Sequence, residues 1–179
     1  MYEMISLDVA GKAMPAMICE PEGEGPHPAL VLAMHMPAHM GLEGDQFTEN
    51  LIQRFADNGY LSIVPFIFHR FPLEMDRMEK LAGFDDQEIH ADQEAAYQWL
   101  IDNENVDSNR VGIVGHCLGG RNAWLSAGYN PNYQVCASMW GGRKNTGWGD
   151  GNPSPLDLTA QINCPVIGIY GNDDGTPSP

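Results

Sequence analysis

Apolar and polar positions alternate between strand-like and helix-like patterns along the chain. Residues 29–34 form a short continuous apolar run, which is typical of a strand buried on both faces of a sheet. Between residues 45 and 58, Leu51, Ile52 and Phe55 form one stripe at helical spacing, and Gly59 ends that helix. The same patterns predict two strands within 4–20, further strands at 60–68, 110–114, 135–140 and 165–170, and helices at 86–102 and 120–127.

Strands that alternate with helices indicate βαβ units, and these units build a mostly parallel sheet with helices on both faces. The predicted fold class is therefore α/β. The length of 179 residues predicts one domain, residues 1–179. The chain stops just after the predicted strand 165–170, so we expect the domain to be incomplete at its C-terminus, without its last strand and helix. An exposed sheet edge, and with it association or instability, would follow from that.

The charge balance restricts the partners that the chain can bind. There are 24 acidic and nine basic residues, which gives a net charge of −15. Such a field repels nucleic acid and anionic membrane surfaces, so we expect neither as a partner. A small-molecule substrate with a negative charge would need a local cationic group. The oligomeric state cannot be predicted from these features.

The cysteines and the N-terminus indicate a cytoplasmic protein. The spacing of the four cysteines matches neither a zinc site nor a small disulfide framework, and free thiols fit a reducing compartment. No signal peptide or apolar run of membrane-spanning length is visible. No pair of histidines has the spacing of metal ligands, so no metal is expected.

The segment with the most specific chemistry runs from Val111 to Arg121. An apolar strand leads into Gly115-His116-Cys117-Leu118-Gly119 and then into a helix. This is the nucleophile elbow of α/β-hydrolases with cysteine in the serine position. The tight turn needs glycine at 115 and 119, and the helix that follows directs its N–H groups at the sulfur, which favours the thiolate. A buried structural cysteine is the alternative, and it is the better interpretation for the other three cysteines, Cys19, Cys136 and Cys164.

These residues resemble the dienelactone hydrolase family, whose elbow commonly has an aromatic residue where His116 stands. The similarity continues in four further segments, which are 55–65, Phe68-His69-Arg70, 138–142 and 165–174. The family's fold and chemistry imply a cofactor-free hydrolase of small esters or lactones that works through a cysteinyl acyl-enzyme.

The resemblance also implies roles for single residues. Cys117 is the nucleophile, and Asp174, chosen over Asp173 by its spacing from Gly171, is the triad acid that orients a histidine. Arg70 corresponds to the arginine that binds a substrate carboxylate. The N–H groups of Leu118 and Met36 are candidates for the oxyanion hole, because Pro37 has no N–H.

The chain departs from the family pattern at the histidine, which the family places after the acid and beyond another strand. Two interpretations remain open: the natural protein continues past Pro179, which we favour, or it works without that histidine. His35 or His39, in the loop after strand 29–34, could replace it as the base or contact substrate. The plainer alternative is that both histidines only shape the edge of the cleft.

Other residues have structural interpretations. His116 should point away from the cleft and pack or form hydrogen bonds within the sheet, and His69 and His90 should lie in a loop and on a helix surface. Arg121 should cap the helix or form a structural pair rather than bind substrate, whereas Trp140 and Trp148 suggest an apolar cleft wall. A second functional hypothesis remains, namely a catalytically inactive α/β-hydrolase-like protein that binds a ligand or regulates a partner. A third is another Cys-dependent reaction, such as thioester or peptide chemistry.

Overall fold

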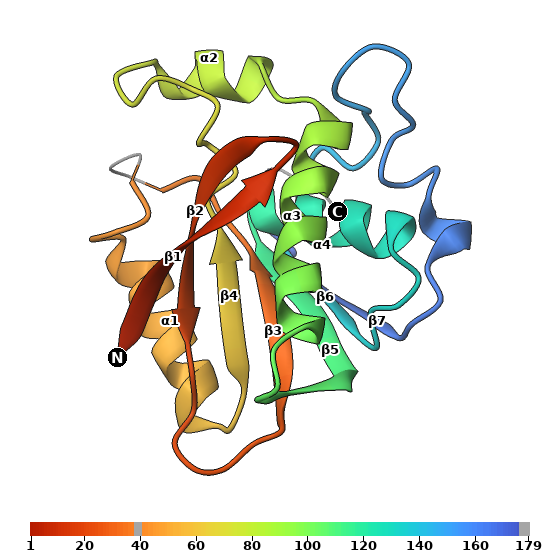
Figure 1. Cartoon of the computed structure of the whole chain (residues 1–179). Coiled ribbons are helices and arrows are strands. Elements are labelled where there is room, and N and C mark those ends of the chain that lie inside the picture. Colours follow the sequence, from red (N-terminus) through yellow and green to blue (C-terminus); the bar gives the residue numbers. More distant parts are fainter. Residues whose placement is uncertain (38–40, 176–179) are drawn as a thin grey trace.

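The computed structural model describes residues 1–37 and 41–175, which form a seven-stranded, mostly parallel sheet. The strand order is β1-β2-β4-β3-β5-β6-β7 (Figure 1). Strands β1 and β2 form an antiparallel hairpin and β2 pairs antiparallel with β4, while the other neighbours are parallel. The strand bounds are β1 Tyr2–Val9, β2 Lys12–Cys19, β3 His27–Ala33, β4 Leu61–Pro65, β5 Val106–His116, β6 Cys136–Met139 and β7 Val166–Ile169. The predicted α/β class is confirmed.

Helices cover both faces of the sheet (Figure 1). Helix α1, Gln46–Asp57, packs Ile52 and Ala56 on one face against side chains such as Leu32 and Val64. Helices α3, Asp86–Ile101, and α4, Leu118–Tyr129, cover the opposite face. Neighbouring residues of one strand point to opposite faces, and for this reason buried central strands such as β3 are apolar at nearly every position.

The structure differs from the predicted elements at several boundaries. Strand β4 ends at Pro65, three residues earlier than expected, because residues 67–70 turn away from the sheet. Strand β5 begins four residues earlier than expected. A short helix, α2, spans Arg77–Ala82, and a 3₁₀ turn spans Thr159–Gln161; neither was predicted.

Strand β7 is the last strand of the sheet, and its apolar side chains are exposed. Val166, Ile167 and Ile169 keep between 37% and 57% of their accessible surface. No helix formed by the described residues is long and apolar enough to cross a membrane.

Candidate active site

Cys117 occupies the turn between β5 and α4, at the carboxyl end of β5. Its backbone has φ 55° and ψ −124°, a conformation that L-residues rarely adopt and that costs on the order of 1–3 kcal/mol. Its own N–H donates to the carbonyl of Met139 at 3.0 Å, so the turn is tied to the end of β6. Helix α4 begins at the next residue, and the Cys117 side chain is exposed. The elbow predicted from the sequence is therefore the observed local structure.

The two elbow glycines are required by backbone contacts. A Cβ on Gly115 would lie 2.1 Å from the carbonyl oxygen of Gly119, and one on Gly119 would lie 1.9 Å from that of Ala33. Neither backbone oxygen can move aside without displacing its strand or helix. Glycine is therefore needed at both positions for close packing, although neither residue has a positive φ.

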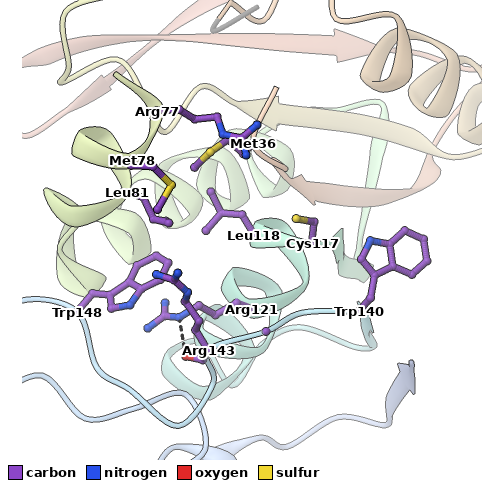
Figure 2. Close-up of a pocket in the computed structure, with 11 residues that line it drawn as sticks. Met36, Arg77, Met78, Leu81, Cys117, Leu118, Arg121, Trp140, Arg143 and Trp148 are labelled. Carbon is purple, nitrogen blue, oxygen red and sulfur yellow. Dashed lines mark hydrogen bonds between the residues drawn. The ribbon is translucent and has the colours of Figure 1, made fainter. Parts of the chain in front are cut away.

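A cavity of about 330 Å³ opens beside Cys117. Figure 2 shows the cysteine between Trp140 on one side and Leu118 with the α2 side chains on the other. The lining residues come from the loop after β3, from α2, from the elbow and from the loop after β6; they are Met36, Arg77, Met78, Leu81, Cys117, Leu118, Arg121, Trp140, Gly142, Arg143 and Trp148. The lining is mainly apolar and includes three arginines, of which Arg77 and Arg143 are exposed and Arg121 is buried.

One wall of the cavity is fastened by a buried guanidinium. Arg121 donates to Asp86 from both terminal nitrogens, at 2.7 and 2.9 Å, and to the carbonyls of Arg143 and Thr146. Its planar group lies 3.6 Å from the centroid of the Trp148 ring. The expected structural role of Arg121 agrees with these contacts, and they hold the loop that carries Arg143 and Trp148 against α3 and α4.

The two histidines nearest the elbow belong to a ring cluster. The Nε2 of His35 lies 2.6 Å from Asp45, and its ring lies 4.8 Å from that of His116. His116 also packs against Phe47 and Trp140. Neither ring nitrogen of His116 has a hydrogen-bond partner, and burial, with the nearby His35, lowers its pKa to about 4. His116 therefore packs as expected, but without hydrogen bonds.

His35 does not line the cavity beside Cys117. It is instead held at the N-terminus of α1 by Asp45, whose carboxylate also accepts a hydrogen bond from Thr48 at 2.6 Å. His39, the other histidine considered as a base, lies outside the described residues.

Arg70 is engaged in a buried ion pair and is not among the cavity-lining residues. Both of its terminal nitrogens donate to Asp92, which is completely buried and also contacts Nε2 of His69 at 3.1 Å. Burial raises the pKa of the Asp92 carboxyl, while Arg70 and His69 oppose that rise.

His69 lies in a turn and His90 on helix α3, as expected, but both are more buried than an ordinary loop or helix-surface position. The His69 side chain is 4% exposed because the turn after β4 folds it onto Asp92. His90 stacks on Tyr129 of α4, and burial lowers its pKa. Both residues lie where the sheet or another helix covers them, which a helical or loop pattern alone does not reveal.

The remaining cysteines have the surroundings expected of structural thiols. Burial raises the pKa of Cys19 and Cys164, and that of Cys136 to about 12. These three residues are buried or half-buried, and Cys117 is exposed at a helix N-terminus. Within the described ranges, no group of three or more His, Cys, Asp or Glu side chains is arranged to hold a metal ion.

Asp174 lies in the turn that follows β7, with its N–H donating to the carbonyl of Gly171 at 3.3 Å. Strands β5, β6 and β7 are parallel, so this turn and the elbow project from the same edge of the sheet.

The model of the Dienelactone hydrolase family matches residues 14–177. The chain belongs to this family. Among curated members, a protein of Escherichia coli strain K12 that bears the name "Putative carboxymethylenebutenolidase" is 29% identical over 181 residues, and the match covers 96% of this chain and 64% of that protein. The carboxymethylenebutenolidase of Rhodococcus opacus is 29% identical over 134 residues, covering 72% of this chain and 51% of its own length.

Solved structures of the dienelactone hydrolase family share the fold. The structure named "Putative Dienelactone Hydrolase", from Klebsiella pneumoniae, has a TM-score of 0.84 and 27% identity, and the match covers 98% of this chain and 74% of that one. The chain thus spans about two thirds or less of the length of the curated relatives it matches.

Four cavity residues of this family member were missed by the sequence analysis: Arg77, Met78, Leu81 and Arg143. Three of them lie on α2, whose boundaries carry recognisable residues. Asp76 caps its start by accepting a hydrogen bond from the N–H of Met78 at 2.7 Å, and Gly83 follows its end. An acidic cap and a terminal glycine with six residues between them could have indicated the helix.

Proposed function

We propose that this chain carries the nucleophile of a hydrolase for small ester or lactone substrates. Cys117 attacks the carbonyl carbon, the alkoxide leaves with a proton, and the thioester that forms is hydrolysed by water, which restores the thiol. One observation carries the proposal: an exposed cysteine at positive φ, directly before a helix N-terminus, faces a cavity at the carboxyl end of β5. The names of the relatives are consistent with this chemistry.

The oxyanion hole is assigned to the N–H groups of Leu118 and Met36. Leu118 is the first residue of α4, where a backbone N–H has no acceptor within its own helix. Met36 lies in the loop after β3, the strand beside the elbow strand, and lines the same cavity. Two such donors stabilise the negative charge that develops on the carbonyl oxygen.

Asp174 is assigned the role of the acid that orients a histidine base. Its position in the turn after β7, at the same edge of the sheet as Cys117, supports the assignment. Among the described residues, His35 is the candidate base. In that arrangement Asp45 rather than Asp174 would hold it: Asp45 occupies Nε2, which leaves Nδ1 as the ring nitrogen that takes the proton. Without a base, the thiol can still be acylated, but water is not activated for the second step.

We assign the binding of a negatively charged substrate group to Arg77 and Arg143 in place of Arg70. Arg70 is occupied by Asp92, and withdrawing it would leave a buried carboxylate without its main partner. Arg77 and Arg143 line the cavity beside the cysteine, in a chain whose overall charge of −15 otherwise repels anions. Trp140 forms the cavity wall on the other side of Cys117 (Figure 2).

The test is hydrolysis of a small activated aryl ester by the chain and by its Cys117→Ala variant, with Cys164→Ala as the matched control. Turnover that is lost in Cys117→Ala and kept in Cys164→Ala supports the proposal. If His35→Ala also abolishes turnover, His35 is identified as the base. A single burst without turnover means that the thiol acylates and that no described residue activates water. If the chain shows no burst and no turnover, the proposal for this chain is contradicted, and a ligand-binding role is favoured instead.

A further inference from the structure

One side of the cavity beside Cys117 is lined by apolar side chains from α2 and its neighbours. Met78 and Leu81 point from α2 toward Leu118, and Met36 and Trp148 close the same side (Figure 2). Met78 is 55% exposed, although it is a large apolar side chain in a strongly charged protein. An exposed apolar residue that converges with four other apolar residues on one cavity indicates a surface that a ligand covers. We call Met78, Leu81, Leu118 and Trp148 the α2 wall.

The base of the α2 wall is rigid. Phe84, just after α2, stacks on Trp148 with ring centroids 6.0 Å apart and planes inclined by 12°. Trp148 in turn lies against the Arg121 guanidinium, which is fixed by Asp86. Met78 is the most exposed member of the wall, and a methionine thioether is well suited to pack against ligands of varied shape.

We propose that the α2 wall is an apolar subsite that takes a hydrocarbon or aryl group of several carbon atoms, carried by the electrophile that Cys117 attacks. The inference names the substrate class of the proposed hydrolase, and it rests on that function only in requiring that Cys117 reacts within this cavity. Burial of each methylene group on the wall raises the reaction rate by about fourfold until the wall is covered.

The experiment measures the rate at which N-methyl-, N-propyl- and N-hexylmaleimide modify Cys117 in the folded chain. The thiolate adds to the maleimide double bond and a proton from water completes the adduct, so neither a leaving group nor a catalytic base is needed. Modification is followed on the peptide that contains Cys117 by mass spectrometry, and each rate is divided by the rate of the same reagent with glutathione.

The normalised rate is expected to rise at least tenfold from the methyl to the hexyl reagent. Met78→Ala should reduce this rise about threefold, and Met78→Glu, which puts a charge on the wall, should abolish it. Leu73→Ala is the control, because Leu73 is also an exposed apolar residue, at 66%, and does not line the cavity. Met78 is exposed, so neither variant should disturb folding.

Equal normalised rates for the three reagents would overturn the subsite, as would a rise that is unchanged in both Met78 variants. Failure of the proposed hydrolase gives a different result. A chain without ester turnover that still favours the hexyl reagent retains the subsite, while a chain with turnover but no chain-length dependence lacks it.

Discussion

Arg121 and Asp86 form a fully buried, two-pronged ion pair between α4 and α3, with N–O distances of 2.7 and 2.9 Å and side chains no more than 1% exposed. Asp86 also accepts a hydrogen bond from the N–H of Trp148, so the pair joins two helices to one wall of the cavity. Removing one partner leaves the other as an isolated buried charge, which is costly in a protein interior.

Arg121→Met is therefore expected to lower the free energy of unfolding by about 3–5 kcal/mol, measured by urea denaturation. The double variant Arg121→Met, Asp86→Leu should recover part of that loss, because it leaves no unpaired charge. Arg110→Met, which removes the exposed partner of Asp107, is the control and should have a much smaller effect. An equal loss for the buried and the exposed arginine would contradict this account.

Gly119→Ala should prevent stable folding, because the added Cβ would lie 1.9 Å from a backbone oxygen of β3. A loss of several kcal/mol is expected, seen as a large fall in Tm or in soluble yield. Gly44→Ala is the control: its φ is 82° and nothing lies within 4 Å of its Cβ, so it should cost only about 1 kcal/mol of backbone strain. A Gly119→Ala variant with normal Tm would show that the elbow is not packed as described.

His116 should make the protein less stable in acid. Its pKa is about 4 when folded and close to 6.5 when unfolded, so the unfolded chain binds a proton that the folded chain excludes. Stability is lost as the pH falls from about 6.5 to about 4, by up to about 3 kcal/mol, and the loss levels off below that window. Urea denaturation at pH 7.5 and 5.0 should show a smaller pH dependence for His116→Phe than for the unmodified chain. Equal pH dependence of the two proteins would contradict the assignment.

Arg143→Gln should affect recognition of charge but not stability. Arg143 is exposed and lines the cavity, and its carbonyl, which accepts from Arg121, is retained in the variant. We expect kcat/KM for a carboxylate-bearing ester to fall about tenfold, while a neutral ester of the same size changes less than twofold.

Arg70→Gln should have the opposite profile, with a clear loss of Tm because Asp92 stays buried without its main partner. Both esters should then be affected alike at temperatures where the variant is folded. Selective loss of the carboxylate-bearing ester in Arg70→Gln, with unchanged Tm, would restore Arg70 as the substrate-binding residue.

Local patterns in the sequence were enough to establish the alternation of strands and helices and the elbow at Cys117. Buried parallel strands need continuous apolar runs, and the tight turn admits only glycine at two positions. The strands and the elbow can therefore be recognised directly in the sequence. The same reasoning predicted a structural role for Arg121, as a cap or in a pair, and an apolar cleft wall that includes Trp140 and Trp148.

Only the tertiary structure decided which charged residues are free to meet a ligand. His69 and Arg70 are neighbours in the turn after β4, and both contact Asp92 of α3 in the interior, while Arg77 and Arg143 remain at the cavity. Such ion pairs depend on long-range packing, and no periodic pattern in the sequence predicts them. The α2 wall was not predicted for a related reason. A six-residue helix is too short for its apolar spacing to stand out, and the contact between Phe84, just after α2, and Trp148 joins segments that are distant in the sequence.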